Sequence, residues 1–247
     1  MEEEEVIKVL DEGRQEEIES CTLSLLGKFL TCKSFNKKAA TNTLKKAWGL
    51  EEGVQIMEVG LNLFLFKFKT EFEMERVFKE GPWTFNNLAL MLCRWQKGMT
   101  ARNVKFESMS LWVQIWEAPF DMVSSKVATE VRSRLGVVVK EEKRQKLEAQ
   151  QLFMRVRVAI PISKPLRMEG FVARSDATRH WVKFKYERLL LFYHYCGLLG
   201  HELYHCASHY AVAKNSGEVE CQYGYWLKAA SSQNWSPTRN KSRNDEE

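Results

Sequence analysis

The chain has 247 residues, and 45% of them are hydrophobic, so it can bury a sizeable core. Its apolar runs are shorter than the ~18–20 residues that a membrane span requires, so we expect no membrane as a partner. Lysine and arginine total 37 against 32 acidic residues, a formal net charge of +5. This moderate basic excess favours a nucleic acid or another polyanion as the partner.

The acidic residues are concentrated at the start of the chain. Residues 1–20 hold nine acidic and two basic side chains, a net of −7, which leaves +12 on the rest. A block of this kind is usually a solvated arm, and the alternative is an arm that masks the basic body. This opening lacks the basic start of a secretory signal, and the six cysteines are scattered. We therefore expect an intracellular protein with reduced thiols.

Residues 21–96 alternate between strand and helix patterns. The expected elements are a strand at Thr22–Cys32, a helix that Ser34 can cap and Gly49 ends, strands at Val54–Val59 and Leu63–Phe68, a helix between Thr70 and Gly81, and a strand at Asn87–Trp95. This strand–helix–strand–strand–helix–strand order predicts a ferredoxin-like domain. The RNA-recognition fold shares the order and stacks bases on exposed aromatic rings. Phe64, Phe66 and Phe68 share one face by alternation, and we expect that face to pack on the helices instead.

Residues 97–190 predict a second, smaller α+β segment. A polar connector at Gln96–Met109 leads into it. Its expected elements are strands at Leu111–Trp116, Val137–Val139, Leu152–Ile160, Gly170–Ala173 and Trp181–Tyr186, a helix at Ser124–Leu135 with Val127, Val131 and Leu135 on one face, and a charged loop or frayed helix at Lys140–Gln150. The chain is thus predicted to be an α+β protein.

A cluster of metal-ligating residue types follows the last strand. It reads Cys196-x4-His201-x4-Cys206, with glycines at positions 197 and 200 that let a short loop fold back on itself. Thiolates and imidazole at such spacing are typical of a tetrahedral Zn²⁺ site. A complete CCHC knuckle would have a further cysteine where this chain has Tyr193, and phenol ionises at a pKa of ~10. The remaining candidates for a fourth ligand are His194 and His209, and zinc binding is predicted to be weakened or partial.

The same stretch carries the candidate nucleic-acid contacts. Exposed aromatic rings stack on unpaired bases, and basic side chains meet phosphates. The candidates are Phe192, Tyr193, Tyr195, Leu198 and Tyr204 for stacking, and Lys183, Lys185 and Arg188 for phosphates. Alternatively, the rings fill the miniature core that an incomplete metal site cannot hold.

Several short runs, taken in order, resemble one family. They are Gly81-Pro82-Trp83, Leu111-Trp112-Val113-Gln114-Ile115, Ile162-Ser163-Lys164-Pro165-Leu166, Phe184-Lys185-Tyr186-Glu187-Arg188-Leu189, the Cys196–Cys206 pattern, and Gln222-Tyr223-Gly224-Tyr225-Trp226-Leu227-Lys228-Ala229. The set is similar to plant proteins derived from LINE-type retrotransposons, in which a domain of unknown function precedes a CCHC zinc knuckle. The resemblance implies nucleic-acid binding, a nuclear location, and Cys196, His201 and Cys206 as zinc ligands.

These observations divide the chain into five parts: an acidic arm (1–20), a ferredoxin-like domain (21–96), a second α+β segment (97–190), a degenerate zinc knuckle (191–209) and a C-terminal tail (210–247). The predicted function is binding of single-stranded RNA or DNA. The alternative is a non-catalytic protein-interaction or self-association module that uses Trp226 and strand edges and has lost metal binding. Motifs for phosphate loops, serine hydrolases and zinc proteases are missing from the sequence, so we expect no enzyme activity.

Overall fold

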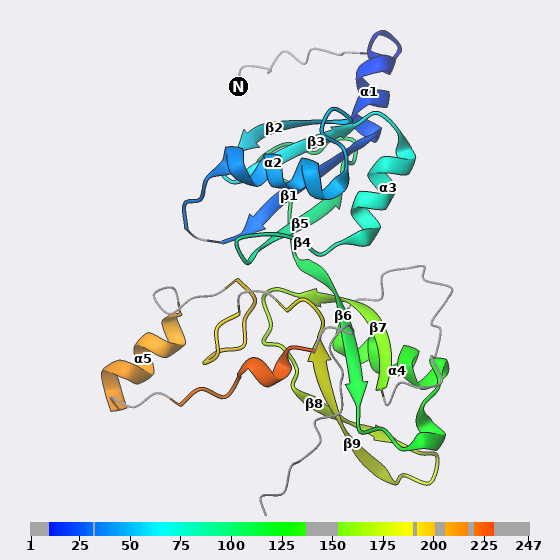
Figure 1. Ribbon diagram of the computed structural model, residues 1–247, viewed down its shortest axis with the longest axis vertical. Coiled ribbons are helices and arrows are strands. Elements are labelled where there is room, and N and C mark those ends of the chain that lie inside the picture. Colours follow the sequence, from blue (N-terminus) through cyan, green and yellow to red (C-terminus); the bar gives the residue numbers. More distant parts are fainter. Residues whose placement is uncertain are drawn as a thin grey trace, which may run out of the picture.

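The computed structural model describes residues 10–31, 33–136, 153–189, 192–200, 206–216 and 220–229. The protein is a mixed α+β structure with two antiparallel sheets, which we call sheet A and sheet B. Figure 1 shows sheet A in the upper half of the molecule and sheet B in the lower half. The described part of the chain contains no helix that is long and apolar enough to span a membrane.

Sheet A is built from the first half of the chain and has the strand order β2-β3-β1-β5-β4. A short 3-10 helix (Glu12–Arg14) and α1 (Gln15–Thr22) precede it. Its elements are β1 (Ser24–Leu30), α2 (Lys37–Trp48), β2 (Val54–Gly60), β3 (Leu63–Phe68), α3 (Glu71–Glu80), β4 (Trp83–Phe85) and β5 (Leu88–Arg94). The six predicted elements are present in the predicted order, and the short strand β4 is an addition that the sequence pattern did not indicate.

Local capping explains where the two helices of this half begin and end. The side chain of Asn36, rather than the predicted Ser34, caps α2 by accepting a hydrogen bond from the backbone N–H of Ala39 at 2.9 Å. Gly49 ends α2 in the left-handed conformation, with φ of 64°. Thr70 caps α3 as predicted, accepting from the N–H of Glu73 at 3.2 Å. Both caps satisfy backbone donors that the first turn of a helix leaves free.

The aromatic stripe of β3 faces the helices. Phe64, Phe66 and Phe68 are buried, and the ring of Phe66 meets that of Trp48 from α2 edge to face, with centroids 5.3 Å apart. The prediction that this face forms core is therefore confirmed. The stripe is not available as a base-stacking platform.

Sheet B is built from the second half and has the strand order β7-β6-β9-β8. Its elements are β6 (Ser108–Trp116), a 3-10 turn (Phe120–Met122), α4 (Ser125–Leu135), β7 (Phe153–Pro161), β8 (Glu169–Ala173) and β9 (Arg179–Tyr186). Four of the five predicted strands and the predicted helix are present. The predicted strand Val137–Val139 and the charged stretch Lys140–Gln150 lie outside the described residues.

One face of sheet B is covered by α4 and forms the second core. Alternate residues of the strands point to it, as the twofold period of a strand requires. They include Leu111, Val113 and Ile115 of β6, Val156 and Val158 of β7, and Val182 and Phe184 of β9, which pack against Ala128, Val131 and Leu135 of α4. The intervening residues of the same strands therefore point to the opposite face.

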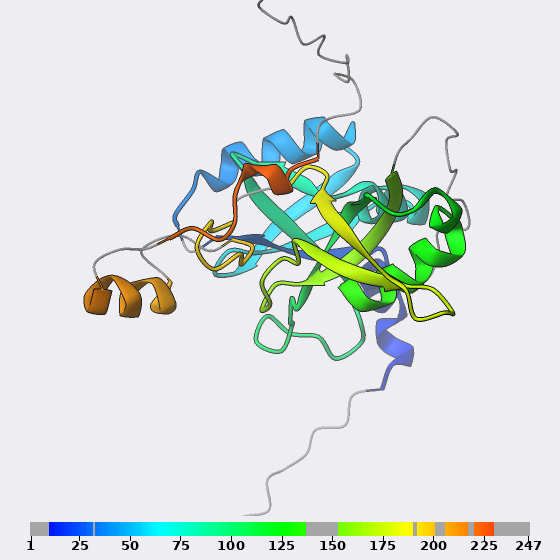
Figure 2. The same ribbon diagram turned by 90° about the horizontal axis from the view of Figure 1, so that it is seen from below.

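The described part of the predicted tail joins this fold. Leu227, in the 3-10 turn Tyr225–Leu227, is 1% exposed within the core of sheet B. The backbone N–H of Ala229 donates to the carbonyl of Tyr186 at 2.9 Å, beside the end of β9. By contrast, α5 (Ala207–Ser216) lies apart from both sheets in Figure 1 and in the perpendicular view of Figure 2.

Candidate zinc knuckle and nucleic-acid interface

The chain leaves β9 and turns tightly through residues 192–200. Phe192 and Leu199 form an isolated bridge. Within it, the N–H of Gly197 donates to the carbonyl of Tyr193 at 2.8 Å, and the N–H of Tyr193 donates to the carbonyl of Leu198 at 3.1 Å. Gly197 and Gly200 have φ values of +69° and +66°, in the left-handed region that favours glycine. The two glycines thus provide the fold-back predicted from their spacing.

Close packing fixes this turn against two other parts of the chain. A Cβ atom at Gly197 would lie 2.5 Å from the ring of Tyr223, and one at Gly200 would clash with the side chain of Leu30 on β1. The N–H of Leu166 also donates to the carbonyl of Gly197 at 3.0 Å. The knuckle region is therefore seated between the 220–229 segment and sheet A.

Two free thiols meet in this region. Burial raises the pKa of Cys196, and a hydrogen bond with the Cys206 side chain adds to that rise. Burial acts in the same direction on Cys206, but its hydrogen bonds outweigh it and lower the pKa of this thiol. The Cys206 sulfur accepts from the backbone N–H of His209 at 3.4 Å and lies 3.2 Å from the Ser208 hydroxyl. Such contacts stabilise a thiolate, which is the form that binds metal.

The position of the absent first cysteine is occupied by a neutral phenol. Partial burial raises the pKa of Tyr193, and the neighbouring thiols of Cys206, Cys221 and Cys196 raise it further. A phenol whose pKa is raised above its usual value is a poor zinc ligand near neutral pH. Tyr193 therefore adds no metal donor to the two thiols.

The two candidate histidines each pack against aromatic rings. His209 lies between two rings, with centroid distances of 5.7 Å to Tyr193 and 5.4 Å to Tyr195. His194 packs against Phe192 at 4.9 Å and Tyr225 at 4.7 Å.

Among the described residues, no group of three His, Cys, Asp or Glu side chains is placed to hold a metal ion. His201, the remaining predicted ligand, lies outside the described residues. The described donors fit half of a tetrahedral zinc site and do not complete it.

The predicted stacking residues divide into two groups. Phe192 is 6% exposed and belongs to the core of sheet B, so the core-filling alternative describes this ring. Tyr193, Tyr195 and Leu198 are half-buried and keep part of their surface in solvent. Tyr204 lies outside the described residues.

The three predicted basic residues lie on β9 and the turn after it. Lys183 is exposed and pairs with Glu117 at 2.9 Å. The ammonium of Lys185 lies 4.9 Å from the centroid of the Trp116 ring. Arg188 is exposed in the turn that leads towards the knuckle, with a positive φ of 49°.

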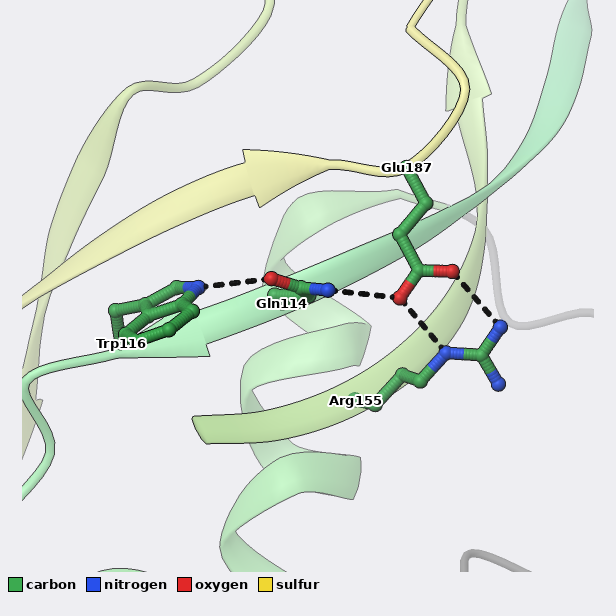
Figure 3. A network of polar contacts seen from close by, with 4 residues as sticks. All are labelled: Gln114, Trp116, Arg155 and Glu187. Carbon is green, nitrogen blue, oxygen red and sulfur yellow. Dashed lines mark hydrogen bonds and ion pairs between the residues drawn. The ribbon is translucent and has the colours of Figure 1, made fainter. Parts of the chain in front are cut away.

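Sequence reasoning missed a polar network on sheet B, beside these basic residues. Gln114, which is 5% exposed, accepts a hydrogen bond from the Trp116 indole and donates to Glu187, both at 3.0 Å. Glu187 in turn accepts two hydrogen bonds from the Arg155 guanidinium, each at 2.8 Å. Figure 3 shows these four side chains on the near side of β6, β7 and β9, with a helix behind. The available signal was alternation, because Trp112, Gln114 and Trp116 are interleaved with buried aliphatic residues.

This hydrogen-bond network also lowers the pKa of the Glu187 carboxyl group. Burial alone raises the pKa of Glu187, but the hydrogen bonds from Arg155 and Gln114 outweigh burial and hold the pKa below its usual value of 4.5. Glu187 is therefore ionised near neutral pH and keeps Arg155 in a fixed position.

Comparison with known protein families identifies two regions of the chain. Residues 17–103, which contain sheet A, match the family model described as "Domain of unknown function (DUF4283)". Residues 160–208, which contain β8, β9 and the knuckle, match the model described as "Zinc knuckle". The predicted combination of a domain of unknown function followed by a CCHC zinc knuckle is thus confirmed. A comparison with curated proteins finds no match.

Proposed function

We propose that this protein binds single-stranded RNA or DNA. The observation that carries the proposal is the zinc-knuckle match over residues 160–208, because knuckles of this class recognise unpaired bases. Within this segment Tyr193 and Tyr195 retain exposed surface, and the basic side chains of Lys183 and Arg188 precede them. Aromatic surface next to cationic side chains is the combination that single-stranded nucleic acid requires.

In this proposal the side chains that contact the nucleic acid do so without a bound metal ion. The tyrosine rings at 193 and 195 would stack on unpaired bases, while Arg188 would neutralise a phosphate. The packing of Gly197 on Tyr223 and of Gly200 on Leu30 holds the backbone of the turn without a metal. Zinc, where bound, would add rigidity through Cys196 and Cys206.

We further infer that zinc binding is weak or partial, and metal analysis tests this. The Tyr193→Cys variant supplies the absent thiol and should raise the zinc content of the purified protein towards one ion per chain. Tyr195→Cys is the matched control, because it adds a thiol to the same loop outside the CCHC spacing and should leave the zinc content unchanged. A parent protein that already holds one tightly bound zinc would contradict the inference and would indicate that a histidine completes the site.

We also propose a ferredoxin-like topology for the first domain and a retrotransposon origin for the chain. The strand order β2-β3-β1-β5, with α2 and α3 on one face, supports a ferredoxin-like arrangement for the first domain. The two family matches in this order support an origin from a plant LINE-type retrotransposon. We infer a non-catalytic protein of the cell interior with a nuclear location.

A second candidate function is self-association or protein binding. It is favoured by apolar side chains that remain exposed near the knuckle, where Trp226 is 60% and Tyr225 69% exposed. Salt discriminates between the two functions, since an apolar interface barely responds to ionic strength whereas phosphate contacts weaken steeply.

Fluorescence anisotropy with labelled RNA, DNA and duplex of one mixed sequence tests the proposed function. We expect tighter binding to either single strand than to the duplex, with affinity falling as salt rises. Equal affinity for single strand and duplex, or no binding at low salt, would contradict the proposal. Salt-independent dimerisation seen by light scattering, without nucleic-acid binding, would favour the second candidate.

A further inference from the structure

The strands of sheet B place aromatic and basic side chains on the face opposite α4. The register pairs Trp112 with Arg157, Gln114 with both Arg155 and Lys185, and Trp116 with both Phe153 and Lys183. Partners in an antiparallel register point to the same side of a sheet. We call this surface the open face of sheet B and define it by Trp112, Trp116, Arg155, Trp181, Lys183 and Lys185.

Two pairs of aromatic rings, Trp116 with Phe153 and Trp181 with Phe171, lie on this face, and we call each pair an aromatic station. The rings of Trp116 and Phe153 stack, with centroids 4.6 Å apart and an interplanar angle of 29°. The rings of Trp181 and Phe171 meet edge to face at 4.2 Å, and these side chains are 40% and 62% exposed. Trp116 and Phe153 are half-buried, whereas Trp181 and Phe171 form an adjoining exposed pair, and an exposed apolar patch is a candidate contact for a partner.

The spacing of the two stations suits successive bases. Trp116 pairs with Lys183, and Trp181 is two residues from Lys183 along β9. Trp116 and Trp181 are therefore diagonal neighbours, whose separation in an antiparallel pair is ~7–8 Å. An extended single strand can place neighbouring bases on both stations, with Lys183 between them for the intervening phosphate.

The charge of the face favours an anionic partner. The strand positions on this side hold five cations, Arg155, Arg157, Arg179, Lys183 and Lys185, against the carboxylate of Glu169. Glu187 and Glu117 pair with Arg155 and Lys183, and the cations still outnumber these three carboxylates. A second copy of the chain docking face to face would bring two such sets of cations together, which opposes self-association here. A polyanion with flat rings satisfies both the charge and the aromatic surface.

The face is also held rigid before any partner arrives. The guanidinium of Arg155 lies 3.6 Å from the centroid of the Trp112 ring, and Glu187 fixes that guanidinium through two hydrogen bonds. The side-chain oxygen of Gln114 accepts a hydrogen bond from the indole N–H of Trp116. Side chains that are already ordered lose little entropy on binding, so each contact contributes more to affinity.

We propose that the open face of sheet B is a second binding surface for single-stranded nucleic acid, with bases on the two aromatic stations and phosphates at Lys183 and Lys185. This proposal rests on the proposed function and adds a surface outside the knuckle. Because β9 carries part of the face and leads into the knuckle, one strand of nucleic acid can contact both surfaces.

The test measures binding of the full chain to a labelled mixed-sequence oligonucleotide of about 20 nucleotides, longer than the ~4–16 that one platform occupies. RNA and DNA are measured separately by anisotropy at low salt. Trp181→Ala should weaken binding about 5–150-fold, the range that the loss of one base–aromatic stack produces. Phe72→Ala is the matched control, since it removes an exposed aromatic ring on α3, outside the face and the knuckle, and should leave affinity unchanged.

A second variant separates a loss of binding contacts from a loss of folded structure. Lys183→Gln alters an exposed side chain without removing packed surface, and it should weaken binding while leaving the circular dichroism spectrum unchanged. Tyr195→Ala reports on the knuckle in the same assay.

The outcomes separate the two proposals. Loss of affinity in both Trp181→Ala and Lys183→Gln supports the open face as a binding surface. Parent-like affinity in both, together with loss in Tyr195→Ala, would overturn this inference and leave the proposed function intact. A parent protein that binds no oligonucleotide would overturn both. Competition by an acidic peptide but not by an oligonucleotide would assign the face to a protein partner instead, and would overturn the inference as well.

Discussion

Sheets A and B use aromatic residues in opposite ways. In sheet A, Phe64, Phe66 and Phe68 alternate along β3 and point into the core beneath α2 and α3. In sheet B, Trp112 and Trp116 alternate along β6 in the same manner, yet they lie on the face away from α4. Alternation decides which residues share a face, but the position of the covering helix decides which face is buried.

The second faces of the two sheets differ as well. In sheet A, Leu30 and Ala89 lie on the face opposite the helices and pack against the core of the second half of the molecule. In sheet B, the corresponding face keeps Trp181, Lys183 and Arg155 exposed. The face of sheet A opposite the helices is thus covered at Leu30 and Ala89 and exposed at Lys28, whereas that of sheet B combines exposed aromatic and basic side chains.

The largest expected effect compares two phenylalanines, one from each sheet. Phe66→Ala removes a fully buried ring packed on Trp48 and should lower the free energy of unfolding by about 3–5 kcal/mol. Phe153→Ala removes a half-buried ring stacked on Trp116 and should cost about 1–2 kcal/mol. Urea denaturation of both variants gives the comparison. Equal losses would mean that the open face of sheet B is a second core rather than a binding surface.

The contact between the knuckle and sheet A gives the next effect. Gly200→Ala forces a left-handed residue and a close contact with Leu30, and should cost about 2–3 kcal/mol of stability. Gly49→Ala is the matched control, with φ of 64° and no atom within 4 Å of a new Cβ, so only the backbone term of about 1–2 kcal/mol applies. Thermal or urea unfolding measures both. Adding Leu30→Ala to Gly200→Ala should recover part of the difference, and no recovery would argue against docking on β1.

The polar network that holds the open face should show a smaller, pH-dependent effect. Glu187→Gln replaces two charge-assisted hydrogen bonds from Arg155 and should cost about 1–3 kcal/mol near neutral pH. Because the folded pKa of Glu187 lies below its unfolded value of 4.5, this contribution is full above pH 4.5 and is lost as the pH falls through the folded pKa.

Urea unfolding of the parent and the variant across this range tests the sign. Glu117→Gln, at the exposed pair with Lys183, is the control and should cost about 0.2–1 kcal/mol. A difference between parent and Glu187→Gln that grows as the pH falls would contradict the assignment.

The smallest effect compares one lysine from each sheet. Lys185→Gln should reduce the slope of log affinity against log salt by ~0.7, the value of one phosphate contact on a single strand. Lys67→Gln, on β3 with its ammonium 3.2 Å from the Ser20 hydroxyl, should leave the slope unchanged. Anisotropy titrations at several salt concentrations measure both. A reduced slope for Lys67→Gln alone would move the binding surface to sheet A.

The sequence by itself determined much of the local structure. Alternation and capping residues located the strands and helices of both halves, and the spacing of Cys196, Gly197 and Gly200 identified the knuckle. Local signals of this kind act within a few residues, so they can be read without knowing the fold. The cap of α2 was misplaced by two residues, because Ser34 and Asn36 can both accept a hydrogen bond from the first turn.

The tertiary structure alone decided which surfaces are open and which donors meet. Phe192 was a candidate base contact by residue type, and long-range packing with the core of sheet B buried it. The hydrogen bond from Arg155 to Glu187 joins residues 32 positions apart, and that from Gln114 to Glu187 joins residues 73 apart. Contacts at such separations depend on strand order and register, which the pattern of one strand does not contain. The open face of sheet B became visible only once β6, β7 and β9 were placed side by side.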